Sequence, residues 1–196
     1  MKKAILGIAV LSTLGFSTLS EAAYNIGPSG NITFNGSLNA VTCSVTDPGA
    51  TVSGANLTYN MGTVGVNELG TELTPSFGPG GVVTGKAMNL VLSCSGGASS
   101  VELKLTPTAR VGRGIAVTGG AQSAQGVQIM LMQGSVVLDF SPGFYTFTNL
   151  TLNGSGATKT YTLPMTAFYT LQFNKNLSDV TSGSANGSLT YTLSYN

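Results

Sequence analysis

The chain has 196 residues, of which eight are Lys or Arg and seven are Asp or Glu, and it contains no His. The absence of His excludes a Ser-His-Asp or Cys-His catalytic arrangement and any imidazole metal ligand. Charged residues make up only 8% of the chain, which excludes the basic patches that attract nucleic acid or anionic membranes. We expect the one close acidic pair, Glu68 and Glu72, to be solvated rather than catalytic. The sequence therefore predicts a protein that is not an enzyme and needs no metal or cofactor.

The first 22 residues have the features of a secretory signal peptide. Lys2 and Lys3 give a positive start, an apolar run follows from Ala4, and Ser20-Glu21-Ala22 places small residues where a signal peptidase cuts. A membrane anchor is the alternative, but the run is shorter than the ~20 apolar residues of a spanning helix. We therefore expect a signal peptide over residues 1–22 and a mature chain that begins at Ala23.

The mature chain is expected to be electrically neutral. Once Lys2, Lys3 and Glu21 are removed, six basic and six acidic residues remain. Gly, Ser, Thr and Asn are abundant, so the surface is expected to be polar and uncharged. Such a balance is compatible with self-association.

Residues 31–38, with the sequence NITFNGSL, alternate apolar and polar residues near the start of the mature chain. This period of two predicts a strand with one dry face and one wet face. The pattern leaves open whether the dry face is buried in this molecule's own core or in that of another molecule.

Cys43 and Cys94 are the two cysteines of the chain. In an exported protein an even number of cysteines predicts a disulfide. The alternative is a pair of free buried thiols. A zinc site would need more soft ligands than two thiols in a chain without His.

Short apolar segments separated by Gly, Asn, Ser and Pro dominate the rest of the chain, and helical periodicity is hard to find. Turn signals such as Asp47-Pro48-Gly49 and Asn153-Gly154 divide the segments. Many short strands at this spacing predict one antiparallel sandwich domain. The expected strands are residues 32–38, 41–45, 57–64, 87–94, 101–106, 127–132, 136–138, 144–152, 159–173 in one or two pieces, and 188–195.

The last of these strands runs to the penultimate residue of the chain. Its apolar face consists of Leu189, Tyr191, Leu193 and Tyr195, and the intervening residues are Ser or Thr. Chain termini usually fray. A terminus with so regular a pattern is therefore expected to be held in place by contacts with other residues, in this molecule or in a partner.

Several short motifs occur in order along the mature chain, behind the signal peptide. They are Gly30-x-Ile32-x-Phe34-x-Gly36-x-Leu38, Asn39-Ala40, Cys43, Met61-Gly62-Thr63-Val64, residues 88–94 (MNLVLSC), residues 124–129 (AQGVQI), Thr166-Ala167-Phe168-Tyr169, Gly183, and Tyr195 second from the end. In this order the motifs resemble the pilin subunits of chaperone–usher fimbriae, of the type 1 and P pilus kind, and the resemblance covers essentially the whole mature chain.

The resemblance implies an all-β, incomplete immunoglobulin-like sandwich that lacks its final strand and is completed by donor-strand exchange. It implies that residues 23–40 are a donor-strand extension and that residues 41–196 are the pilin domain. The donor side chains would be Ile32, Phe34, Gly36 and Leu38, with Phe34 bulkier than the usual aliphatic residue. The disulfide Cys43–Cys94 would join the first core strand to a later one. The missing strand would leave a hydrophobic groove, lined by Leu189, Tyr191, Leu193 and Tyr195 of the last strand. The terminal carboxylate of Asn196 would be held by basic residues of a chaperone.

The partners implied by the resemblance are a periplasmic chaperone, an outer-membrane usher and other pilin subunits, in a chain exported through the periplasm to the cell-surface fimbrium. The implied function is a structural subunit of the pilus used in cell adhesion. One alternative is a tip, adaptor or adhesive subunit that binds a host glycan or protein. Another is a secreted enzyme or inhibitor on a plain sandwich, in which residues 32–38 would be the first strand of the molecule's own fold.

Overall fold

The computed structural model describes residues 41–196. The expected signal peptide and the expected donor segment with Ile32, Phe34, Gly36 and Leu38 lie outside the described residues. Residues 41–196 form strands and three short 3-10 turns, η1 (Val66–Glu68), η2 (Gly120–Gln122) and η3 (Leu177–Asp179). None of the helical segments in this range is long and apolar enough to cross a membrane. The prediction of an all-β chain is confirmed for the described residues.

The larger sheet contains seven strands. Its order is β1-β6-β13-β10-β9-β8, with β11 paired to β10, and every pairing is antiparallel. The strands are β1 (Thr42–Thr46), β6 (Lys86–Ser95), β8 (Arg110–Val111), β9 (Gly114–Ala116), β10 (Val127–Gln133), β11 (Val136–Val137) and β13 (Thr158–Leu171).

The smaller sheet has the order β12-β7-β14, again antiparallel throughout. Its strands are β7 (Ser100–Pro107), β12 (Tyr145–Thr151) and β14 (Leu189–Tyr195). Two separate hairpins complete the described residues, β2 (Thr51–Ser53) with β3 (Asn56–Thr58), and β4 (Phe77–Gly78) with β5 (Gly81–Val82).

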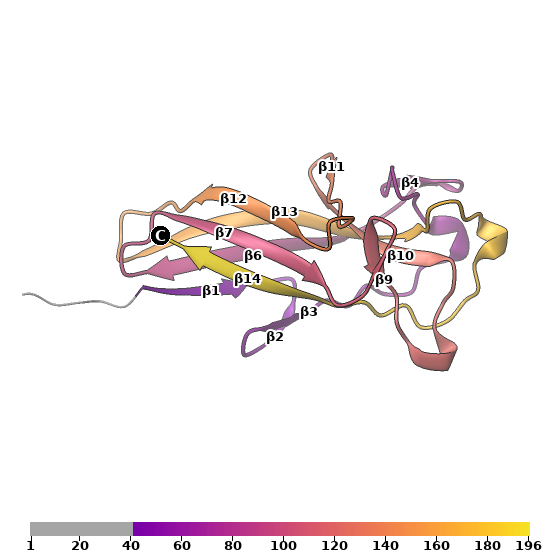
Figure 1. The fold of residues 1–196 in the computed structure, drawn as a ribbon, viewed down its shortest axis with the longest axis horizontal. Helices are drawn as coiled ribbons and strands as arrows, with labels where there is room; N and C mark the ends of the chain where they lie inside the picture. Colours follow the sequence, from indigo (N-terminus) through magenta and orange to yellow (C-terminus); the bar gives the residue numbers. More distant parts are fainter. Residues whose placement is uncertain (1–40) are drawn as a thin grey trace, which may run out of the picture. The chain divides into compact units, whose positions relative to one another are not determined.

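The hydrophobic core draws on both sheets. Leu92 of β6 and Leu163 of β13 come from the larger sheet and Leu103 of β7 from the smaller one, and all three are fully buried in the same cluster. Apolar residues recur at every second position of these strands, which is the pattern that one buried face of a sheet requires. Figure 1 shows the two sheets packed against each other.

Most of the expected strands are confirmed, and residues 159–173 form a single strand that ends at Leu171. The expected strand over residues 57–64 is wrong for most of its length, because only Asn56–Thr58 pairs. Five short strands were not predicted, since two or three residues are too few to show a periodicity. They are β2, β4, β5, β8 and β9.

The order of the long strands matches an immunoglobulin sandwich with one strand fewer. The constant-type immunoglobulin fold has sheets A-B-E-D and C-F-G. Taken in chain order, the six strands β1, β6, β7, β10, β13 and β14 form the sheets β1-β6-β13-β10 and β7-β14, which correspond to A-B-E-D and C-F. Within residues 41–196 no strand occupies the position of G beside β14. The prediction of an incomplete immunoglobulin-like sandwich is therefore confirmed.

Candidate strand-acceptor site

The outer edge of β14 is unpaired in the described part of the chain, because β7 is its one strand neighbour there. At the two ends of this pairing, the Asn196 amide donates to the Ser100 carbonyl and the Thr108 amide donates to the Ser188 carbonyl. Backbone hydrogen bonds alternate in an antiparallel ladder, so the even-numbered residues of β14 bond to β7. The residues whose backbone groups are directed away from β7 form what we call the acceptor edge, and they are Leu189, Tyr191, Leu193 and Tyr195.

The side chains of the acceptor edge are apolar and incompletely covered. Leu189, Tyr191 and Leu193 are half-buried against the main core, and Tyr195 is 47% exposed. The Ser and Thr residues between them are exposed. The regular alternation seen in the sequence therefore corresponds to a row of apolar side chains that an added strand could bury further.

Asn196 continues the β14 ladder past the end of the strand. Its side-chain Oδ1 accepts a 2.7 Å hydrogen bond from the Ser100 hydroxyl. A hollow of about 230 Å³ opens beside it, with Val101, Glu102 and Asn149 in its lining. The structure thus places all five groove residues expected from the sequence along one edge and its end.

The second unpaired edge belongs to β1, which pairs with β6 alone among the described strands. Cys43 lies directly opposite Cys94, and the two form a disulfide with a Cα–Cα distance of 4.1 Å. The predicted disulfide is therefore confirmed. Directly opposite residues this close belong to a non-hydrogen-bonded pair, so the backbone groups of Cys43 and Val45 are directed away from β6.

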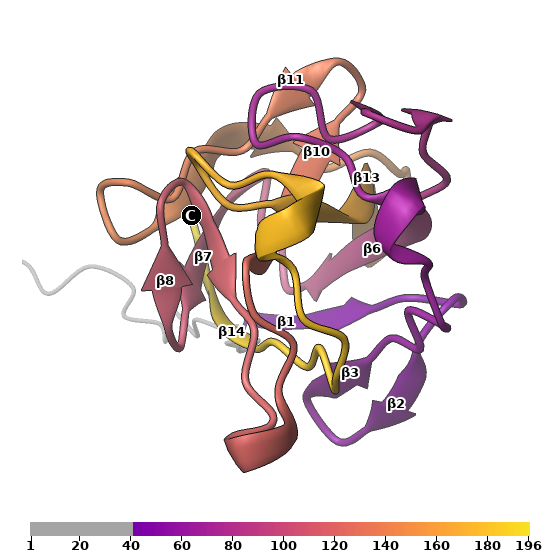
Figure 2. The same cartoon turned by 90° about the vertical axis from the view of Figure 1, so that its right-hand side faces the viewer.

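Two tyrosines of β14 reach across to the first part of the described chain. The Tyr195 hydroxyl donates to the Val41 carbonyl over 3.3 Å, and the Tyr191 hydroxyl donates to the Ala55 carbonyl over 2.6 Å. No backbone ladder joins β1 to β14, although both lie on the same side of the sandwich in Figures 1 and 2. Side chains rather than a strand therefore bridge the two edges.

Residues 57–61 behave as a strand in their side chains but not in their pairing. Leu57, Tyr59 and Met61 are half-buried against the core, while Thr58 and Asn60 are exposed. The backbone pairs with β2 only as far as Thr58. The sequence pattern predicted a strand because it indicates which side chains are buried. A strand also needs a neighbouring strand to pair with, and residues 59–61 have none among the described strands.

A buried carboxylate anchors this segment. Asp47 is 2% exposed and accepts hydrogen bonds of 2.6 Å from the Tyr59 hydroxyl, 2.6 Å from the Asn89 amide and 2.7 Å from the Gly49 amide. Burial, with the hydrogen bond to Asp47 and its negative charge, raises the pKa of Tyr59 well above its ordinary value. The end of β1, residues 57–61 and β6 are thereby fixed to one another.

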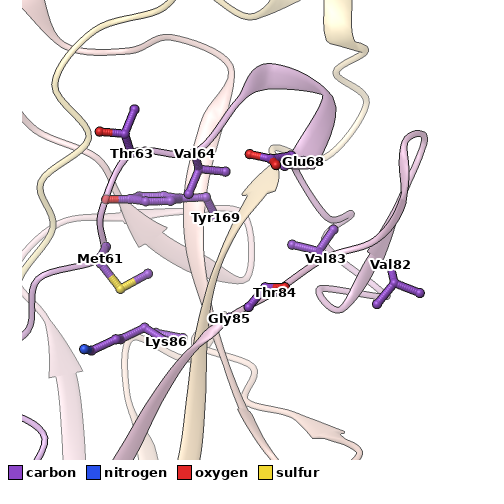
Figure 3. Close-up of a pocket in the computed structure, with 11 residues that line it drawn as sticks. Met61, Thr63, Val64, Glu68, Val82, Val83, Thr84, Gly85, Lys86 and Tyr169 are labelled. Atoms are coloured by element: carbon purple, nitrogen blue, oxygen red, sulfur yellow. The ribbon is translucent and has the colours of Figure 1, made fainter.

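A pocket of about 330 Å³ lies where β6 begins (Figure 3). β1 does not cover this part of β6, since its last pair is Thr46 with Val91. The Tyr169 hydroxyl donates to the Ala185 carbonyl over 2.7 Å, and burial raises the pKa of Tyr169. The lining mixes apolar and polar side chains, among them Met61, Val64, Glu68, Val82, Lys86 and Tyr169.

Comparisons with known proteins give likenesses to solved structures alone. No family model and no curated protein matches the chain. The crystal structure of the P pilus rod subunit PapA is 19% identical, covers 85% of this chain and 100% of its own, and has a TM-score of 0.48. The crystal structure of the CupB6 tip adhesin from Pseudomonas aeruginosa is 18% identical over 55% of this chain, with a TM-score of 0.38. This chain covers 30% of the length of that adhesin.

Proposed function

We propose that this chain is a structural subunit of a chaperone–usher fimbria and that it polymerises by donor-strand exchange into the pilus used in cell adhesion. The observation that carries the proposal is the acceptor edge of β14, which combines free backbone groups with half-buried apolar side chains. An open edge of this kind can pair with an added strand. Residues 31–38 carry the alternation that such a strand needs.

The size of Gly36 supports an antiparallel register of the donated strand against β14. When the four donor residues are laid antiparallel against the acceptor edge, Gly36 falls beside Tyr191 and Phe34 beside Leu193. The Tyr191 side chain already extends toward Ala55, so the adjoining position suits a residue without a side chain. A parallel alignment of the same residues would instead set Phe34 beside Tyr191, two large rings at one position.

Apolar burial supplies the driving force. At ~1.5–3 kcal/mol for each large apolar side chain, Ile32, Phe34 and Leu38 would contribute roughly 5–9 kcal/mol before the cost of association. Residues 57–61 would lie on the other side of the donated strand and would gain the neighbour that they lack. Hydrogen bonds to both sides would add to the apolar term.

An uncovered apolar edge promotes aggregation, so the subunit needs a cover before it is assembled. We propose that a periplasmic chaperone supplies this cover and that its basic residues hold the carboxylate of Asn196. The outer-membrane usher would then exchange the chaperone for the next subunit. The expected signal peptide over residues 1–22 fits this route through the periplasm to the cell surface.

A shaft subunit is the role that we favour over a tip or adaptor subunit. A donor segment combined with an acceptor edge suits a shaft subunit and an adaptor alike, but shaft copies must polymerise with themselves. The chain's six basic and six acidic residues after signal removal leave no net charge to oppose self-association. The role is tested by whether the mature chain forms fibres of its own copies, as a shaft subunit should. Deletion of residues 23–40 is the control, because the remaining domain should still accept a strand but should no longer extend such a fibre.

The central test is a self-complemented chain, in which residues 41–196 are followed by a short turn and then by the sequence of residues 31–38, moved to the C-terminal end. A short turn after Asn196 allows only an antiparallel strand beside β14. We expect a monomer that folds without a chaperone and has a higher melting temperature than residues 41–196 alone. A copy with Phe34→Asp and Leu38→Asp is the control, and the proposal fails if it stabilises the domain equally well.

The register has its own test in the same chain. Gly36→Val in the appended strand should lower the melting temperature, because its side chain would meet Tyr191. Adding Tyr191→Ala should recover part of that loss by opening space. Additive losses in the double variant would contradict the placement of Gly36 beside Tyr191.

A further inference from the structure

The hairpin of β4 and β5 carries an exposed apolar patch. Phe77 and Val82 lie directly opposite each other, so their side chains share one face of the hairpin. They are 56% and 86% exposed, and Leu73 in the preceding turn is 64% exposed. We call Phe77 and Val82 the hairpin patch. Val82 also lines the rim of the pocket in Figure 3.

Glycines fix this hairpin by direct contact between backbones. At each of three positions a Cβ atom would overlap a carbonyl oxygen of a nearby residue, which means that the two backbone segments touch. The overlaps are Gly70 with Pro75, Gly78 with Leu69, and Gly80 with Asn67. The hairpin patch is therefore presented on a rigid support, and a preorganised surface loses little entropy when it binds.

The hairpin patch lies at the end of the sandwich where β14 begins. Gly70 bridges to Thr170 near the end of β13, and β6 begins at Lys86, four residues after Val82. The first residue of β14, Leu189, pairs with the last residue of β7, and β7 runs back from the far end of β6. Figure 1 shows β4 at this end and the C-terminus at the opposite end.

Resting on the proposed function and its antiparallel register, we propose that the hairpin patch is the docking surface for the next copy of this chain in the fibre. In that register Leu38 of the next copy lies beside Leu189. Its Val41 follows three residues later, which at full extension is about 10 Å away. The next domain must therefore begin at the end that carries the hairpin patch.

The size and charge of the next copy favour this contact. A domain of this length has a radius of gyration of about 15 Å, so a copy tethered at Leu189 covers much of that end. Residues 41–196 carry six basic and six acidic side chains, so no net charge repels the copy. The end of the next copy at which its β1 begins would face the hairpin patch. That end carries the turn over residues 96–99 and Tyr195, which is 47% exposed.

The test uses fibres of the full mature chain with a photoreactive benzoylphenylalanine at position 77. Illumination is expected to link position 77 to residues 95–99 or 195 of a second copy. The same probe at position 52 is the matched control, because Val52 is 47% exposed on the β2–β3 hairpin, which lies away from that end (Figure 1). It should give no such link.

A second measurement tests the docking surface separately from the donor-strand exchange on which it rests. In the antiparallel register, a disulfide should form in the fibre between copies carrying Thr33→Cys and Ser194→Cys, and a parallel register would instead join Thr33→Cys to Thr190→Cys. If the first disulfide forms and position 77 links only within its own copy or to the side of another fibre, the docking surface is wrong while strand exchange stands. If the first disulfide does not form, the register fails and the docking surface fails with it.

Discussion

Thr170 lies directly opposite Gln128 in the β10–β13 ladder, and both side chains are fully buried. The Gln128 side-chain amide donates to the Leu171 carbonyl over 3.2 Å. Within residues 41–196, however, Oε1 of Gln128 and Oγ1 of Thr170 have no hydrogen-bond partner. The structure therefore gives these two buried oxygens no protein partner, and burying a polar atom without a partner lowers stability.

Replacing the Thr170 hydroxyl with a methyl group should stabilise the protein. We expect Thr170→Val to raise the free energy of unfolding of the self-complemented chain by about 1 kcal/mol, because the shape is kept and an unpaired polar atom is removed. Denaturant unfolding measures the change. Thr162→Val, at an exposed position of the same strand, is the control and should have little effect. A destabilised Thr170→Val variant would show that the hydroxyl has a partner after all.

Removing the disulfide should weaken the domain substantially. Cys43 and Cys94 are 51 residues apart in sequence, and closing a loop of that length stabilises a fold by about 4 kcal/mol in the chain-entropy model. The double variant Cys43→Ser, Cys94→Ser is expected to lose that amount in denaturant unfolding of the self-complemented chain. Wild-type protein unfolded in reducing buffer should match it, and an unchanged midpoint in both experiments would contradict the estimate.

Asp47→Ala should be among the most damaging single substitutions in the domain. It would leave the Asn89 amide and the Tyr59 hydroxyl without their acceptor, and we expect a loss of about 3 kcal/mol in the free energy of unfolding. Asp179→Ala is the matched control, since Asp179 also accepts a backbone hydrogen bond, from Asn176, but is exposed. Equal losses in the two variants would mean that burial of Asp47 is not what matters.

Alkaline pH should destabilise the domain through Tyr59. Its pKa is raised in the folded state, while in the unfolded chain a tyrosine titrates near 10, so above about pH 10 the unfolded state binds fewer protons than the folded state. The contribution is complete below about pH 10 and is lost as the pH rises toward the folded pKa. Tyr59→Phe should show a shallower fall in melting temperature above pH 10 than wild type. Parallel curves would show that Tyr59 does not carry the effect.

The sequence by itself determined most of the long strands and the faces of those strands. A period of two places alternate side chains on one face whatever the neighbouring strand is, so β14 and its apolar residues Leu189, Tyr191, Leu193 and Tyr195 were predictable. The disulfide was also predictable, because the prediction needed only the number of cysteines and the expected export, and not the details of packing.

Only the tertiary structure decided which edges are open. Thr190 of β14 pairs with Thr106, 84 residues earlier in the sequence, and no local pattern states on which side a strand receives its neighbour. The same limit explains residues 59–61, whose side chains alternate without a strand beside them in the described range. It also explains Asp47, which begins an ordinary Asp-Pro-Gly turn in the sequence yet is buried. The Gly49 amide bonds to it within that turn, but the Tyr59 hydroxyl and the Asn89 amide reach it only when β1, residues 57–61 and β6 meet.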